Sequence, residues 1–360
     1  MDKISRHNNF DLIRLIAALQ VLCWHSWEHF ELPFDWLNKV VYFTRFFPGV
    51  PIFFTISGFL IYASFERNRL SVRQYFRNRI LRIYPGLWCV VLFTLILMIG
   101  VGYLRMGQVF SKEIIAWLIA QMTILQTYTP NVLREFGVGT PNGSLWTIGI
   151  ELSFYIFLPI FFLIKKMLNA NSKSRSVLLI IIFFIASYAF NQYFFHKYAS
   201  TELSNVLKLV KFSLLPYLFY FLLGCIIYVA WAKVQKWYVN KALYWALVYL
   251  IYIFVFSIWL HKYSPSYWPN LFDLISIIIL SQLVISFAFT KPHIANILKG
   301  NDISYGVYLY HMPVMNTFIY LGYKGTVIGM ILLFVVTICL AIFSWRFVEK
   351  RFLRMKVKYK

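Results

Sequence analysis

The chain has 360 residues, of which 60% are hydrophobic and only 13% are charged. Soluble globular domains contain about 25% charged residues, so this composition excludes a soluble domain and predicts a helical membrane protein. The formal net charge of +22 lies mostly in short segments between apolar runs, as in cytoplasmic loops, and we expect no nucleic-acid partner. A membrane β-barrel is excluded because the apolar runs are long and do not alternate with polar residues.

Ten apolar runs are long enough to cross a bilayer, so we predict an all-α, polytopic transmembrane helical bundle. In chain order the expected spans lie near 10–30, 46–64, 85–104, 145–164, 177–195, 212–231, 243–260, 271–289, 304–322 and 327–346. Basic clusters follow every second span, which places both termini in the cytoplasm. We predict one integral-membrane domain over residues 8–350 and a basic cytoplasmic tail over 351–360. No cleavable signal peptide is expected, because the first run is too long and lacks a small-residue cleavage site.

Three segments between or within the spans need separate interpretation. Residues 65–84 hold six arginines and are expected to form a cytoplasmic loop. Residues 113–127 are apolar but short, and we expect an interfacial or re-entrant helix rather than a span. The rest of 105–144 is rich in Gly, Pro and Asn and should form the largest outer loop. The four cysteines fall in apolar runs without CxxC spacing, so neither a disulfide nor a metal site is expected.

Ionisable side chains well inside the apolar runs are few, and burial of their charge is costly enough to mark functional candidates. They are Arg14, His25, Glu151 and His311. Arg14 and His25 are eleven residues apart, so both project from one face of the first helix, about 16 Å apart along its axis. Asp11, three residues before Arg14, can pair with it.

Glu151 and His25 are expected at similar depths, about 9 Å and about 8 Å below the outer surface. A carboxylate beside a histidine is the arrangement of a general base with its orienting partner. Structural alternatives remain open at this point. Each histidine could be a hydrogen-bonding group between helices, Arg14 could reach the inner surface, and Glu151 could be a protonated structural carboxyl.

Six motifs occur in order along the chain. They are FDLIRLIAALQVLCWH (Arg14, His25), GVPIFFTISGFLI (Ser57, Gly58), RNRILRIYP (Arg79, Arg82), NGSLWTIGIELSFYIFLP (Trp146, Glu151), ISYGVYLYHMPV (Tyr308, His311) and WRFVEKRF (Arg346, Glu349). In this respect the chain, over about residues 8–350, resembles acyltransferase family 3, integral-membrane O-acyltransferases that modify bacterial surface polysaccharides and related glycans. One departure is Thr147, where a serine is usual.

The resemblance implies an acyl-CoA donor, most often acetyl-CoA, used from the cytoplasmic side as a co-substrate rather than a permanently bound cofactor. It implies a sugar hydroxyl, usually lipid-linked, as acceptor on the outer side of the bacterial cytoplasmic membrane. His25 is then the expected general base and Glu151 its orienting partner, while a covalent acyl-histidine stays an open variant. Arg14, Arg79 and Arg82 are expected to hold the donor phosphates.

Other residues of the motifs receive weaker roles. Ser57 or backbone amides near Gly58 could stabilise the oxyanion. His311 is either a second functional group or a link between helices, and Trp146 could stack on a sugar ring. Tyr308 and Asp11 complete the candidates. No metal ligand is among them, and the sequence indicates no oligomeric state.

Two other classes of protein compete with an enzyme. A proton-coupled secondary transporter of an anionic or sugar-like solute would also place ionisable groups in the membrane, but transporters tend to show internal repeats and none is visible here. A flippase-like or scaffolding partner of a polysaccharide pathway would have no chemistry of its own. Only the enzyme would consume acyl-CoA and free a thiol.

Overall fold

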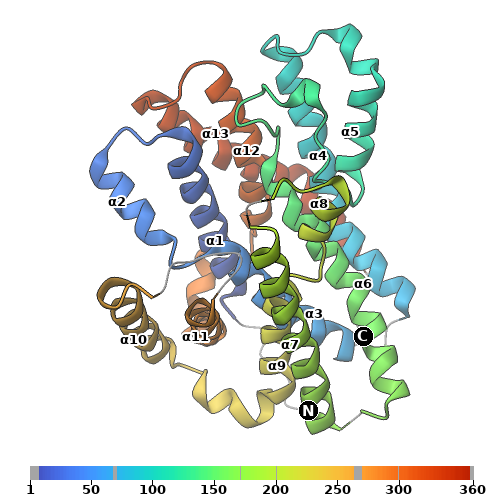
Figure 1. Cartoon of the computed structure of the whole chain (residues 1–360), viewed down its shortest axis with the longest axis vertical. Helices are drawn as coiled ribbons and strands as arrows, with labels where there is room; N and C mark the ends of the chain where they lie inside the picture. The colour runs from blue at the N-terminus through green and yellow to red at the C-terminus, as the bar shows by residue number, and fades with distance from the viewer. Residues whose placement is uncertain are drawn as a thin grey trace. The chain divides into compact units, whose positions relative to one another are not determined.

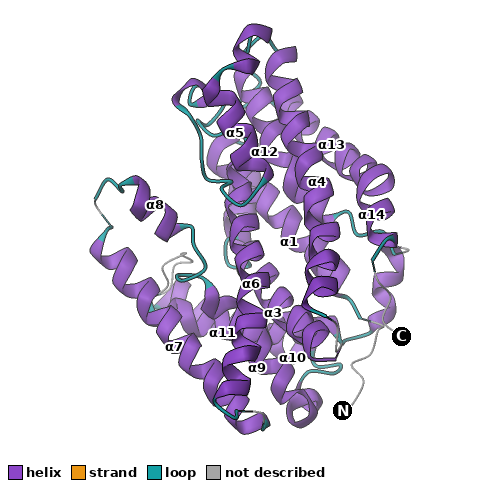
Figure 2. Cartoon of the chain, turned by 90° about the vertical axis from the view of Figure 1, so that its right-hand side faces the viewer, coloured by secondary structure: helices purple, strands orange, loops and turns teal. Residues whose placement is uncertain are grey.

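The computed structural model describes residues 8–67, 71–170, 172–199, 201–262, 270–298 and 300–356. Over these residues the chain forms helices joined by loops and turns, and no strand is present (Figure 2). The predicted all-α class is therefore confirmed. In chain order the α-helices of at least seven residues, together with two of the π-helical segments, are α1 (Phe10–His25), η1 (Ser26–Phe30), α2 (Asp35–Thr44), α3 (Gly49–Arg67), α4 (Val72–Gly100), α5 (Lys112–Met122), α6 (Trp146–Met167), α7 (Lys173–Lys197), α8 (Asn205–Lys211), α9 (Leu218–Val234), α10 (Ala242–Ile253), α11 (Leu271–Ala288), α12 (Ser304–Tyr320), α13 (Val327–Ser344) and η8 (Trp345–Glu349).

Eight helical stretches in the described ranges are long and apolar enough to cross a membrane, and they coincide with eight of the ten expected spans. The chain is thus a multi-pass membrane protein. The other two expected spans, 10–30 and 304–322, are occupied by α1 of 16 residues and α12 of 17 residues. These two helices carry the histidine motifs, and their crossing of the membrane stays a prediction.

The described part of the arginine-rich segment 65–84 is mostly helical, contrary to the expected loop. Helix α4 begins at Val72, because the side chain of Ser71 accepts a hydrogen bond from the Gln74 amide and so caps the helix. The helix then runs through Pro85 to Gly100. A proline inside a helix removes one backbone hydrogen bond, but it does not break this long helix. Arg79 and Arg82 therefore project from a helix.

The described chain divides into two compact units. Unit 1 comprises Met1–Ala17, Phe46–Leu70 and Ile150–Gly300, and unit 2 comprises Ala18–Arg45, Ser71–Gly149 and Asn301–Lys360. The boundaries fall within α1 and within the first turns of α6. Each unit is described by itself below, and the predicted single domain over 8–350 stays a prediction.

In unit 1, α3 packs against α9, α7 lies along α9, and α10 pairs with α11 (Figure 1). Close approach of α3 and α9 depends on two glycines. A Cβ at Gly58 would lie 2.8 Å from the carbonyl carbon of Phe221, and a Cβ at Gly224 would lie 2.6 Å from the amide nitrogen of Phe59. Small residues at such contacts let helix backbones approach closely. The side chain of Asn9 donates to the carbonyl groups of Phe287 and Thr290 at the end of α11.

In unit 2, α12 is the central helix and packs against α13, α4 and the π-helical segment η1 (Figure 1). Every residue of α12 from Gly306 to Thr317 is buried, as expected of a helix in the core of a bundle. Two glycines again permit contact: Gly86 of α4 faces the ring of Tyr305, and Gly306 faces the backbone of Ala341. The hydroxyl of Tyr305 donates to the carbonyl of Ile83 at 2.9 Å.

Helix α5 occupies the first part of the segment 113–127 and is shorter than a membrane span. Its 11 residues measure about 16 Å, against a hydrocarbon core of about 30 Å. The indole of Trp88, which lies in α4, donates to the carbonyl of Met122 at the end of α5 at 2.9 Å. The side chain of Gln121 donates to the carbonyls of Gln126 and Tyr128. These bonds satisfy backbone carbonyls at the end of α5 and in the irregular segment after it, and the choice between an interfacial and a re-entrant helix stays a prediction.

Candidate functional site

Two histidines that are far apart in sequence meet in unit 2. Nδ1 of His25, the last residue of α1, lies 2.8 Å from Nε2 of His311 in α12, and the two rings are stacked with centroids 5.1 Å apart. His311 is 0% exposed, whereas His25 is half-buried. Of the two residues, only His25 is therefore partly exposed, and His311 lies behind it in the core of unit 2. A π-helical turn, η1, begins directly after His25, and such turns are frequent at functional sites.

The acceptors around the pair determine which nitrogens carry protons. The carbonyl of Val307 only accepts, so Nδ1 of His311, at 3.2 Å, donates to it. His311 is fully buried and an unpaired buried charge is costly, so we assign it as neutral. Its Nε2 then accepts, and Nδ1 of His25 donates. Nε2 of His25 keeps its lone pair, which is the form that a general base requires.

The backbone of α12 near His311 is held from outside the helix. Pro313 has no N–H, so the carbonyl of Leu309, four residues earlier, loses its helical partner. The side chain of Asn142 donates to this carbonyl at 2.9 Å. The hydroxyl of Ser144 donates to Oδ1 of Asn142 at 2.7 Å and lies 3.3 Å from the carbonyl of Tyr308. The segment that carries the NGS sequence therefore fixes the turn of α12 that presents His311.

Further contacts tie the same loop to α12. The hydroxyl of Tyr308 contacts that of Thr147 at 2.5 Å and donates to the carbonyl of Ser144 at 3.0 Å. A threonine thus serves where a serine is usual. The side chain of Asn316 accepts from the amide of Val138 and donates to the carbonyls of Thr140 and Pro141. The outer loop is in this way packed on the helix that carries His311. Trp146, half-buried, begins α6 beside this loop.

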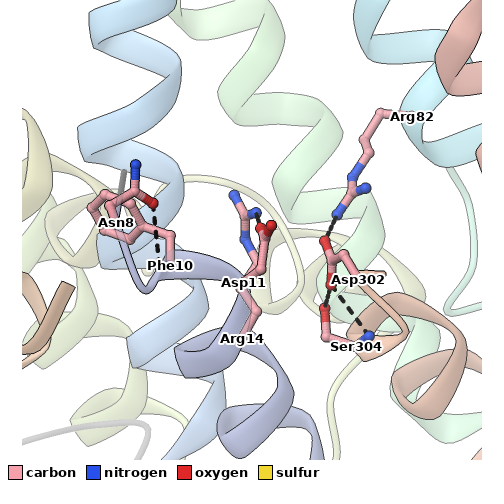
Figure 3. A network of polar contacts seen from close by, with 7 residues as sticks. All are labelled: Asn8, Phe10, Asp11, Arg14, Arg82, Asp302 and Ser304. Carbon is pink, nitrogen blue, oxygen red and sulfur yellow. Dashed lines mark hydrogen bonds and ion pairs between the residues drawn. The ribbon is translucent and has the colours of Figure 1, made fainter. Parts of the chain in front are cut away.

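Five predicted site residues lie in unit 1, of which Asp11, Arg14 and Glu151 are ionisable. Arg14 pairs with Asp11 at 3.1 Å, as predicted (Figure 3), and α1 is one continuous helix from Phe10 to His25. Glu151 accepts a hydrogen bond from the hydroxyl of Tyr155 one turn later in α6. The predicted pairing of Glu151 with His25 stays a prediction.

Ser57 and Gly58 occupy the middle of α3, where both pack inside unit 1 and Ser57 is buried. In unit 2 the two arginines of α4 have different partners. The guanidinium of Arg79 lies 5.5 Å from the centroid of the Tyr75 ring, and Arg82 is bound to Asp302 at 2.5 Å. Of the sequence-predicted residues, His25, His311 and Tyr308 are brought together.

Comparison with known proteins identifies the family of this chain. The family model described as an acyltransferase domain matches residues 7–346. This chain belongs to the acyltransferase domain family. A protein named nodulation protein 10, from Rhizobium leguminosarum bv. viciae, is 32% identical, and the alignment covers 98% of this chain and 95% of the relative. A protein named O-acetyl transferase, from Shigella phage Sf6, is 26% identical with 97% of each chain covered.

A putative peptidoglycan O-acetyltransferase of Bacillus subtilis (strain 168) is 23% identical, and the alignment covers 94% of this chain and 54% of the relative. No solved structure matches this chain. The chain is therefore a multi-pass membrane acyltransferase, and the resemblance inferred from the six motifs is confirmed.

Sequence reasoning missed two residues of this acyltransferase that the structure ties to α12. Asn142 was part of a motif without a role, yet Pro313 alone indicates that the carbonyl of residue 309 needs a donor from elsewhere. Asp302 stands two residues before Ser304 and accepts hydrogen bonds from its amide and hydroxyl. An acidic residue just before a helix is a recognisable capping signal. In the described ranges no group of three His, Cys, Asp or Glu side chains is placed to hold a metal ion.

In this acyltransferase we expect Asn142→Leu to lower the free energy of unfolding by about 1–3 kcal/mol, because the buried Leu309 carbonyl loses its donor. With Pro313→Ala the new amide can bond that carbonyl within the helix. The cost of Asn142→Leu should then shrink, which thermal unfolding of the four variants in detergent will measure. Asn131→Leu, at an exposed position of the same loop, is the control. Equal cost of Asn142→Leu with and without Pro313 would contradict this assignment.

Proposed function

We propose that this acyltransferase moves an acyl group, with acetyl as the expected one, from acyl-CoA to a sugar hydroxyl. The donor binds from the cytoplasmic side of the bacterial cytoplasmic membrane. The acceptor is a surface polysaccharide or its lipid-linked precursor. The observation that carries the proposal is the His25–His311 pair, because its hydrogen bonds leave Nε2 of the half-buried His25 as a base. The printed names of the phage and Bacillus relatives support O-acetyl transfer, and the second supports a glycan acceptor.

The pair suits direct transfer. Nε2 of His25 removes the proton of the sugar hydroxyl while that oxygen attacks the thioester carbonyl. The carbon–sulfur bond then breaks, and the imidazolium returns the proton to the leaving thiolate, so that the products are the ester and free CoA. His311 holds the ring of His25 in one tautomer throughout. Glu151 is proposed as a further support of the developing imidazolium, as the motif resemblance implies. A covalent acyl-histidine, with Nε2 as nucleophile, is the variant that trapping of labelled enzyme would reveal.

Donor and oxyanion contacts follow from the remaining motif residues. The phosphates of CoA need cations, and Arg14 and Arg79 are proposed to supply them. For the oxyanion we propose the hydroxyl of Ser57. Backbone amides near Gly58 are less suitable, because they lie in the interior of α3, where each N–H bonds a carbonyl one turn earlier.

The test uses purified protein in lipid vesicles with acetyl-CoA and the lipid-linked glycan of the producing cell. Thiol release is followed with a chromogenic disulfide, and ester formation by proton NMR of the glycan. Thiol release that depends on glycan and matches ester formation supports the proposal. Solute uptake without thiol release would favour a transporter instead. Release with succinyl-CoA but not acetyl-CoA would change the acyl group and keep the reaction.

A further inference from the structure

A part-buried ion pair links α4 to the residues that precede α12. A guanidinium nitrogen of Arg82 lies 2.5 Å from Oδ2 of Asp302, and the two side chains are 21% and 6% exposed (Figure 3). The partners are 220 residues apart in sequence, and both belong to unit 2. The sequence resemblance assigns Arg82 to the donor phosphates and gives Asp302 no role.

The other oxygen of the same carboxylate holds the start of α12. Oδ1 of Asp302 accepts a hydrogen bond from the amide of Ser304 at 3.3 Å and another from its hydroxyl. At the next residue, the hydroxyl of Tyr305 donates to the carbonyl of Ile83, and the Tyr305 ring lies against Gly86. The first turn of α12 is thus attached to α4 by a charge pair, a hydrogen bond and a close contact.

The attachment bears on His311 because a helix transmits its position along its axis. His311 lies seven residues after Ser304, about two turns and about 10 Å along α12. The next part of α12 is held by Asn142 and Ser144. The Arg82–Asp302 pair therefore fixes the inner end of the helix segment whose far end places Nε2 of His311 on His25.

A phosphate group must be bound by a cation, and the guanidinium of Arg82 is already paired with the carboxylate of Asp302. Transfer of Arg82 to a phosphate would leave the carboxylate of Asp302, a residue that is 5% exposed, without its counter-charge. Breaking one partner out of a buried pair is far more costly than replacing both. Resting on the proposed function above, we propose that Arg82 and Asp302 are positioning residues that set α12, and through it His311 and His25, and that donor phosphate is bound by other arginines.

The test compares neutral near-isosteres in the vesicle assay with acetyl-CoA. Asp302→Asn keeps an oxygen for Ser304, and Arg82→Met keeps most of the apolar stem. Each single variant should lower kcat by about a hundredfold, the size expected of a displaced catalytic group, with the donor KM within about twofold of wild type. The double variant, which removes both charges of the pair, should recover at least about tenfold of that loss. Arg77→Met, at an exposed position of the same helix, should leave both constants unchanged.

Other outcomes would overturn the proposal. A donor KM raised tenfold or more by Arg82→Met, with Asp302→Asn near wild type, would make Arg82 a donor ligand. Wild-type kcat in both single variants would also refute it. A second measurement does not need activity: the rate at which diethyl pyrocarbonate modifies His25, read by mass spectrometry. This rate should change in both single variants and return toward wild type in the double variant. If wild-type protein frees no thiol, the proposed function fails, and the modification rates still decide the positioning role.

Discussion

His25→Ala is expected to reduce acyl transfer by about 10²–10⁴-fold, the usual contribution of a general base, and to lower the free energy of unfolding by about 1–3 kcal/mol, the cost of one buried group left without its donor. The ring is half-buried at the end of α1. Its loss removes the lone pair that Nε2 presents and leaves Nε2 of His311 without a donor. Thiol release in vesicles and acetyl esters on the glycan are the two measurements.

His29→Ala is the matched control for this prediction. Its ring centroid lies 5.8 Å from that of His25, on the next turn and half-exposed, so it tests whether any nearby imidazole will do. His311→Ala should fall between the two, because His25 survives but loses the partner that fixes its tautomer. Full activity of His25→Ala would refute the mechanism, although the family membership would stand. Equal losses for His25→Ala and His29→Ala would point to a general disturbance of η1.

Gly58→Val is expected to prevent recovery of folded protein. Its Cβ would collide with the carbonyl group of Phe221, and a backbone cannot rotate away as a flexible side chain can. Overpacking of a core costs about 1–3 kcal/mol even where side chains can adjust, and total stabilities are only about 5–15 kcal/mol. Fluorescence-detected size-exclusion chromatography of detergent extracts should show aggregate instead of a monodisperse peak.

Two variants make this result interpretable. In Gly224→Val the new side chain would collide with the backbone of α3 at the same helix contact, so aggregate is expected again. Gly100→Val, at the end of α4, would place its Cβ where no atom lies within 4 Å, and should yield near-normal protein. Well-folded but inactive Gly58→Val would instead indicate a role for this glycine at the oxyanion, as its motif first suggested.

Local patterns predicted the helical class, eight of the spans and the candidate histidines, because each depends on neighbours in sequence. Apolar length sets a span, and burial cost alone marked His25 and His311. The pairing of the two could not be predicted, since equal depth says nothing about which helices are adjacent. Glu151 was selected because its expected depth matches that of His25, and depth does not tell whether the helices of these two residues are adjacent.

The errors have physical causes as well. Residues 72–84 were expected to form a loop because they are highly charged, yet arginine and glutamine are good helix formers and Ser71 supplies a cap. Arg79 and Arg82 looked equivalent as cations of one motif. The distinction between them comes from Asp302, 220 residues away, which no local pattern indicates.

The separation of His25 and His311 has a consequence for biosynthesis. Their sequence distance is 286 residues, so a ribosome that adds about 5–20 residues per second reaches His311 about 15–60 s after His25. During that interval the nascent chain carries the imidazole of His25 without its partner, and chains terminated before α12 never acquire that partner. Full competence for the proposed acyl transfer is therefore expected only after α12 has been made.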